Sequence, residues 1–364
     1  MPALPTSAAL PRRPSLLTAA VFSAALLALA ACGGSDGDAP PAPAPVAPAA
    51  FTLQLLHLSD GEAGLLAGST AKNLAALVDA FDDDYANTLI LAGGDTYLPG
   101  PFLAAGTDPS VIATLNAVTG STLAANATVP IGAVDTAIHN VLGVEVSAIG
   151  NHEWDLGSTA FAGSINAGGG WVGANYALVS ANLDVSGDSA IRGLADKTLG
   201  GSAANDFIFD NAATVKGKIV PAVVVEKGGE RIGIVGATTQ ILEAISSPTG
   251  TEIKGFPTGP GANGETDNMA LLAAQLQPII DQMRADGINK IILQAHLQNI
   301  ANEKQLATLL KGVDIILAAG SNTRLGDADD EAVSFPGHDA NFADTYPLVI
   351  TDAEGGKTLI VNTD

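Results

Sequence analysis

The chain has 364 residues, of which 47% are hydrophobic and only 4% aromatic, and its formal net charge is −22. So acidic a surface repels phosphate backbones, which argues against a nucleic-acid polymer as partner, although bound divalent cations would reverse the field around a small phosphate ester. Cys32 is the single cysteine, which excludes an intrachain disulfide and a cysteine-based zinc site.

The N-terminal segment has the layout of a secretory signal. Arg12 and Arg13 precede an apolar run that ends in LAACG at positions 29–33. This ending resembles a bacterial lipobox, in which the cysteine is lipidated after cleavage; the alternative is an ordinary signal peptide with a chance cysteine. We predict a lipoprotein signal peptide over 1–32 with lipidation at Cys32, a Pro-rich tether over 33–50, and a protein exported and lipid-anchored at the bacterial cell envelope, facing the periplasm or the cell surface.

Short apolar runs alternate with helical patterns in the remaining chain, which predicts an α/β fold with a mainly parallel sheet. The predicted strands are Thr52–Leu58, Thr88–Leu91, Glu145–Ile149, Lys290–Ala295 and Val313–Ala318. The predicted helices are Thr70–Phe81, Met269–Met283 and Glu303–Leu310. Lys216–Val225 and Glu230–Val235 are expected to pair as a hairpin. The folded domain is expected to span 51–364, and its end in an apolar run suggests a truncated chain.

Polar side chains follow each of the five predicted strands. In open α/β sheets, ligands bind beyond the carboxyl ends of the strands. Carboxylates, amides and histidines that gather at one edge of a sheet indicate a metal cluster. The residues in question are Asp60, Glu62, Asp95, Asn151, His152, His296 and Asn322. His57, within a predicted strand, and His139, within a helical pattern, are expected to be structural.

The order of these motifs resembles the calcineurin-like metallophosphoesterases, especially the secreted 5′-nucleotidase and 2′,3′-cyclic-nucleotide phosphodiesterase branch. That family has D-x-H, G-D, G-N-H-E, an isolated H and G-H-x-H in this order. Here LHLSD stands at 56–60, GD at 94–95 and GNHEWD at 150–155. The resemblance implies a four-layer sandwich of two mixed β-sheets flanked by helices. It also implies two divalent metals ~3.5–4 Å apart and a metal-activated hydroxide that attacks phosphorus.

Three metal-binding histidines of the family are replaced in this chain. Glu62 stands at the first position, Gly320 at the second and Asn322 at the third. By position, the resemblance implies a first metal held by Asp60, Glu62, Asp95 and Asn322, and a second held by Asp95, Asn151 and His296. The first set offers only oxygen atoms, which favours Mg²⁺, Mn²⁺ or Ca²⁺, whereas the His296 site could take Zn²⁺ or Mn²⁺.

The resemblance also implies two catalytic residues. His152 would face the phosphate and protonate the leaving group, and Asp155 would orient it. We therefore predict a metal-dependent hydrolase of a small phosphate ester, with a nucleotide as one candidate, although the C-terminal domain that holds the base in this family is missing from the sequence. One alternative is a weakened or inactive metal- and phosphate-binding lipoprotein on the same fold. Another is a Ca²⁺-stabilised surface module. The sequence identifies no protein partner.

Overall fold

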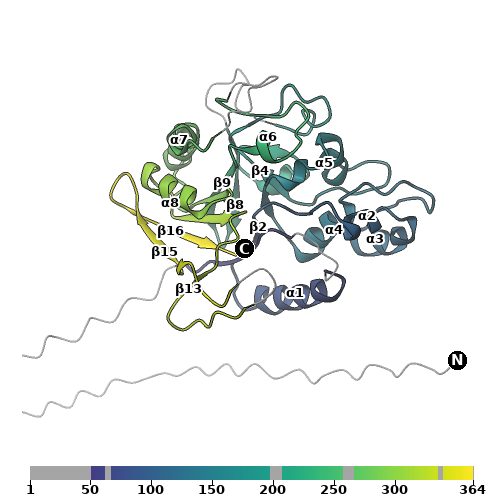
Figure 1. Ribbon diagram of the computed structural model, residues 1–364, viewed down its shortest axis with the longest axis horizontal. Coiled ribbons are helices and arrows are strands. Elements are labelled where there is room, and N and C mark those ends of the chain that lie inside the picture. Colours follow the sequence, from purple (N-terminus) through teal and green to yellow (C-terminus); the bar gives the residue numbers. More distant parts are fainter. Residues whose placement is uncertain (1–50, 62–66, 197–206, 257–265, 335–338, 364) are drawn as a thin grey trace, which may run out of the picture. The chain divides into compact units, whose positions relative to one another are not determined.

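Two β-sheets lie face to face at the centre of the fold, and helices cover their outer faces (Figure 1). The computed structural model describes residues 51–61, 67–196, 207–256, 266–334 and 339–363. The predicted signal peptide, the tether and Cys32 lie outside these residues. Among the described residues, none of the helices combines the length and the apolar character needed to cross a bilayer.

The first sheet has five strands, and every described pair in it is parallel. Its three central strands are short apolar runs with mostly buried side chains, as expected for parallel strands covered on both faces. In spatial order they are β1 (Gln54–Leu58), β2 (Thr88–Ala92), β3 (Val146–Ala148), β4 (Ala177–Val179) and β7 (Ile219–Val220).

The second sheet has seven strands and is mixed. β9, β11, β12 and β16 are mutually parallel. β8 runs antiparallel to β9 but parallel to β6, and β15 runs antiparallel to β16. In spatial order the strands are β15 (Leu348–Thr351), β16 (Lys357–Asn362), β12 (Ile315–Ala319), β11 (Ile291–His296), β9 (Glu230–Thr238), β8 (Ala222–Lys227) and β6 (Ile208–Phe209). Two small ribbons complete the strands, β5 (Leu183–Asp184) with β10 (Glu252–Ile253) and β13 (Leu325–Gly326) with β14 (Asp344–Thr345).

Helices pack on the outer face of each sheet. α7 (Met269–Ala285) and α8 (Ile300–Leu309) cover the second sheet with buried residues such as Leu276 and Leu306. α5 (Ser158–Ile165) contributes Phe161 to the core outside the first sheet. α4 (Ala133–Leu142) packs with α3 (Ile112–Thr119) and α5, and α1 (Ala67–Asp82) contacts α4 and β1. The short helices are α2 (Pro101–Ala105), α6 (Leu242–Ile245), η1 (Pro109–Val111), η2 (His152–Trp154) and η3 (Ala212–Thr214).

The predicted four-layer α/β sandwich is confirmed, with two corrections. The first sheet is parallel in its described pairs rather than mixed. The expected strand Lys216–Val225 is in fact two strands in different sheets, because Pro221 lies between β7 and β8. Proline has no N–H to donate to a strand ladder, so it is a natural place for the chain to leave one sheet and enter the other. The second half of the predicted hairpin, β8 with β9, does form.

Candidate metal centre and active site

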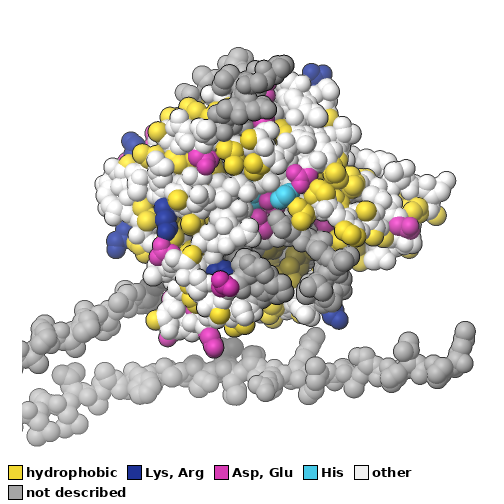
Figure 2. Space-filling view, in the orientation of Figure 1, with side chains coloured by type: hydrophobic (Ala, Val, Ile, Leu, Met, Phe, Trp, Pro, Cys, Tyr) yellow, Lys and Arg dark blue, Asp and Glu magenta, His cyan; other side chains and the backbone are white. Residues whose placement is uncertain are grey.

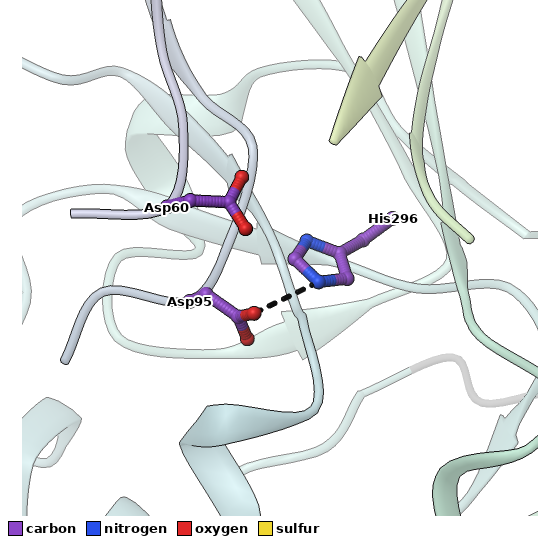
Figure 3. A group of neighbouring side chains, drawn as sticks. All are labelled: Asp60, Asp95 and His296. Atoms are coloured by element: carbon purple, nitrogen blue, oxygen red, sulfur yellow. Dashed lines mark ion pairs between the residues drawn. The ribbon is translucent and has the colours of Figure 1, made fainter. Parts of the chain in front are cut away.

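Three of the predicted ligands meet beyond the ends of β1, β2 and β11. Asp60, Asp95 and His296 each offer one ligand atom, and these atoms all lie within 4.8 Å of one another. Figure 3 shows both carboxylates directed toward the imidazole ring. His296 Nε2 lies 3.0 Å from Asp95 Oδ2. Both of these residues are buried, with 0% and 1% of their surface exposed. Residues 35 or more positions apart in the chain therefore converge at one edge of the fold.

The imidazole of His296 is oriented by the backbone. Its Nδ1 lies 2.9 Å from the carbonyl oxygen of Gly93, which can only accept a hydrogen bond, so Nδ1 carries a hydrogen and Nε2 faces the carboxylates. Burial lowers the pKa of His296, but the charge and hydrogen bond of Asp95, with the charge of Asp60 and the Gly93 carbonyl, outweigh it and raise the pKa to about 10. Nε2 therefore holds either a proton or a cation between itself and the carboxylates.

Asp60 is held from two sides. Ser59 Oγ donates a hydrogen bond to Asp60 Oδ2, and the backbone N–H of Gly320, after β12, donates to the same oxygen at 3.1 Å. The Asp60 backbone is left-handed, with φ of 50°. These contacts connect the end of β1 to the end of β12 and fix the carboxylate at the cluster.

The fit of a cation can be tested on this donor set. Two carboxylates and one imidazole face a common point, and a carbonyl behind the imidazole leaves Nε2 as the metal-facing atom. Metal-binding histidines usually donate their other ring N–H to a carbonyl or a carboxylate in this way. Divalent cations such as Mn²⁺, Mg²⁺ or Ca²⁺ therefore suit the residues present.

His152 and Asp155 form a dyad beside this cluster. His152 Nδ1 lies 2.5 Å from Asp155 Oδ2, and Ser246 Oγ donates to Asp155 Oδ1 at 2.7 Å. The backbone N–H of His152 donates to Asp95 Oδ1 at 2.7 Å, so the dyad is attached to a predicted ligand. The His152 side chain is 25% exposed and can reach a bound molecule. Figure 2 shows one patch of histidine surface bordered by acidic side chains on the face in view.

Glu153 is part of the site, although sequence reasoning assigned it no role. Its buried carboxylate accepts hydrogen bonds from the backbone N–H groups of Asp95 (3.0 Å), Thr96 (2.7 Å) and Gly150 (2.8 Å). Burial, followed by the charge of Asp95, raises the pKa of Glu153, and the N–H of Thr96 opposes this rise. Glu153 thereby ties the loop after β2 to the loop after β3.

The three other predicted ligands are Asn151, Asn322 and Glu62. Asn151 is buried, and its Oδ1 accepts a hydrogen bond from Gln298 Nε2 at 2.5 Å. Gln298, which sequence reasoning missed, also lies 2.9 Å from His296 Nε2. Asn322 follows β12 with an exposed side chain and φ of 48°, and its role as a ligand stays a prediction. Glu62 lies outside the described residues.

The two histidines predicted to be structural do not belong to the group of three ligands. His57 is in β1, and its Nδ1 lies 2.8 Å from Thr363 Oγ1. His139 is buried on α4. Burial lowers the pKa of His139 to about 4 and raises that of Asp135, one turn earlier on the same helix, to about 7.

Proteins named 5′-nucleotidases are similar to this chain in sequence and in fold. Mouse 5′-nucleotidase is 26% identical over 222 residues, which cover 61% of this chain and 30% of the mouse protein. The structure of a 5′-nucleotidase precursor from Thermus thermophilus matches with a TM-score of 0.58 and 26% identity, over 86% of this chain and 49% of that one. The chain is a distant homologue of these 5′-nucleotidases.

The match to this family is partial. The trifunctional nucleotide phosphoesterase protein YfkN of Bacillus subtilis (strain 168) is 24% identical over 201 residues, which cover 53% of this chain and 12% of that protein. No protein-family model matches the chain. The chain spans about 30% of the length of the 5′-nucleotidases it matches, and this part corresponds to their N-terminal metallophosphatase region.

Proposed function

We propose that this distant homologue of the 5′-nucleotidases is a metal-dependent hydrolase of a small phosphate ester, with a nucleotide as the first candidate. The observation that supports it most is the meeting of Asp60, Asp95 and His296 beside the His152–Asp155 dyad. A buried histidine against two carboxylates needs a proton or a cation, and a partly exposed histidine held by a third carboxylate is available to a bound substrate.

The residues of the chain supply three functions to such a reaction. Asp60, Asp95 and His296 would hold divalent cations, which neutralise charge on phosphoryl oxygens and activate water when bound. Asp155 holds His152 Nδ1, so Nε2 is the atom that can give a proton to the leaving-group oxygen. Ser246 in turn fixes Asp155. Glu153 keeps the two loops that carry Asp95 and His152 in register.

The two-cation assignment is part of the proposal. Asp60, Glu62, Asp95 and Asn322 would hold the first cation, Mg²⁺, Mn²⁺ or Ca²⁺. Asp95, Asn151 and His296 would hold the second, Mn²⁺ or Zn²⁺. Metal analysis of the purified full chain tests this directly, with two equivalents of Mn²⁺ as the expected result.

The activity is tested with the full chain, p-nitrophenyl phosphate, its diester and a nucleoside monophosphate, each with Mn²⁺, Mg²⁺, Ca²⁺ or Zn²⁺. We expect turnover that needs a divalent cation and that falls at least ~100-fold in Asp95→Asn, because this carboxylate contacts both His296 and His152. Asp329→Asn, an exposed acidic position, is the matched control. Equal turnover in Asp95→Asn and Asp329→Asn would contradict the proposal.

A second candidate is a weakened or inactive metal- and phosphate-binding protein. One observation favours it: Gly320 has no side chain to offer, and the Gln298 amide contacts both Asn151 and His296. In that case the wild-type chain would bind Mn²⁺ and inorganic phosphate in calorimetry but would hydrolyse none of the esters.

We also propose export and lipid anchoring through Cys32, supported by the N-terminal sequence alone. Expression of the full chain in a bacterium with labelled palmitate tests this. We expect label and membrane association in the wild type and neither of them in Cys32→Ser; an unlabelled wild-type chain would contradict the anchor.

A further inference from the structure

Gln298 lies in the middle of the candidate metal centre. It follows His296 by two residues, in the turn between β11 and α8. Its amide group lies between two predicted ligands, with Nε2 at 2.5 Å from Asn151 Oδ1 and at 2.9 Å from His296 Nε2. Neither the sequence motifs nor the resemblance gave this residue a task.

Gln298 also shares an unusual backbone conformation with three of the predicted ligands. In the described part of the chain, four residues other than glycine have a positive φ: Asp60 (50°), Asp95 (49°), Asn322 (48°) and Gln298 (64°). The first three are predicted metal ligands. Such backbone conformations persist where the surroundings impose them, and they gather at functional sites. Asp and Asn tolerate this region better than other residues, so Gln298 is the most unusual of the four.

The position of the amide is linked to the glycine at 320. A Cβ atom on Gly320 would lie 2.5 Å from Gln298 Nε2 and 2.5 Å from His296 Nε2, and Gly320 itself has φ of 77°. A side chain at 320 would therefore clash with both the Gln298 amide and the His296 imidazole in their present positions. The resemblance puts a metal-binding histidine at this position, and the Gln298 amide lies where the side chain of that histidine would begin.

We propose that Gln298 is a metal ligand that replaces the histidine lost at Gly320, with its amide oxygen as the donor atom. A half-turn of the amide group exchanges Nε2 for Oε1 and presents an acceptor at the same place. Amide oxygens are common ligands of hard cations. The cation would then be shared with Asn151, His296 and Asp95. With an amide oxygen in place of an imidazole, the site should favour Mn²⁺, Mg²⁺ or Ca²⁺ over Zn²⁺. The inference rests on the metal centre of the proposed function.

The test is Mn²⁺ binding to the full chain, measured by calorimetry, with the number of bound ions counted by metal analysis. In Gln298→Ala we expect the affinity of one Mn²⁺ ion to fall at least ~10-fold or that equivalent to be lost, since even indirect partners of metal ligands cost ~10–100-fold when removed. Gln298→Glu keeps the side-chain length and adds a charged oxygen, so its Mn²⁺ affinity should equal or exceed that of the wild type. Gln305→Ala, on the exposed face of α8, is the matched control and should bind like the wild type.

The possible results distinguish a failure of the metal centre from a failure of the role given to Gln298. A wild-type chain that binds no Mn²⁺ would overturn the metal centre itself. If the wild type binds Mn²⁺ and Gln298→Ala binds it equally well, only the role of Gln298 is wrong. Tighter binding or an additional Mn²⁺ in Gln298→Ala would show that the amide blocks a cation position instead of serving it, and would also overturn the inference. Loss of binding in Gln298→Ala with retention in Gln298→Glu would support it without concern for misfolding.

Discussion

A methyl group at Gly150 offers the sharpest test of how closely the site is packed. An alanine Cβ at this position would lie 2.1 Å from Asp95 Oδ1 and 2.7 Å from His296 Cε1. Ordinary contacts between such atoms exceed ~3.5 Å. The carboxylate would have to retreat by more than ~1 Å, yet its two oxygens are engaged by the His152 N–H and by His296. Gly150→Ala should therefore disrupt the ligands rather than merely crowd them.

The expected cost has two parts. Overpacking of this kind typically destabilises a protein by ~1–3 kcal/mol, and the fixed surroundings place Gly150→Ala at ~3 kcal/mol, which lowers Tm by about 4–5 °C in a domain of this size. A misplacement of about 1 Å also costs ~100-fold in turnover, and metal affinity should fall with it. Thermal unfolding measures the first part, and a turnover assay together with Mn²⁺ calorimetry measures the second.

Gly193→Ala is the matched control. Nothing lies within 4 Å of a Cβ built on Gly193, and neither glycine has a positive φ. This control should be neutral or gain up to ~1 kcal/mol from reduced freedom of the unfolded chain. If Gly150→Ala matched Gly193→Ala in both Tm and Mn²⁺ affinity, the close approach of Asp95 and His296 around Gly150 would be refuted.

Three further predictions concern protons. His152→Ala should lower the turnover of an alkyl phosphate ester by ~100-fold or more and leave the Mn²⁺ affinity unchanged. The turnover of p-nitrophenyl phosphate should fall much less, because the p-nitrophenolate leaving group needs no proton. Equal losses with both substrates would show that His152 is not the general acid. His296 has a pKa of about 10, so Mn²⁺ must displace a proton from it in order to bind. The Mn²⁺ association constant measured by calorimetry should therefore rise ~10-fold per pH unit between pH 6 and 9. An association constant that does not change with pH would contradict this prediction. Burial raises the pKa of Asp135 to about 7, so its charge destabilises the fold increasingly as pH rises from about 4 to 7. Asp135→Asn should therefore raise Tm at pH 8, with a gain of a few kcal/mol in the free energy of unfolding, and leave Tm unchanged near pH 4. A lower Tm of this variant at pH 8 would show that the carboxylate is needed.

Much of the site could be predicted from sequence because its residues follow strands. Asp60, Asp95 and His296 each stand at or just after the end of an apolar run, and the carboxyl ends of parallel strands meet at one edge of a sheet. His152 and Asp155 are three residues apart in one short turn, so their contact is local. These features need only strand positions and strand direction, which apolar runs indicate well.

The missed residues depend on contacts that no local pattern contains. Glu153 bonds to backbone N–H groups 57 and 58 residues away, and backbone groups leave no trace in side-chain identity. Gln298 reads as an ordinary polar residue before the cap of α8, and neither its left-handed backbone nor its contact with Asn151 is visible in the sequence. The break at Pro221 did have a signal in the sequence, the proline itself, but the apolar run continues on both sides of it and reads as one strand.

The left-handed residues at the site have a consequence for how this chain could change. Glycine adopts that backbone conformation without a steric cost, so a Gln298→Gly exchange would relax the main chain while removing the amide. Selection for thermal stability alone would therefore favour glycine at these positions, whereas selection for metal binding and catalysis would oppose it. Variants recovered from a screen for higher melting temperature should be checked at positions 60, 95, 298 and 322 first.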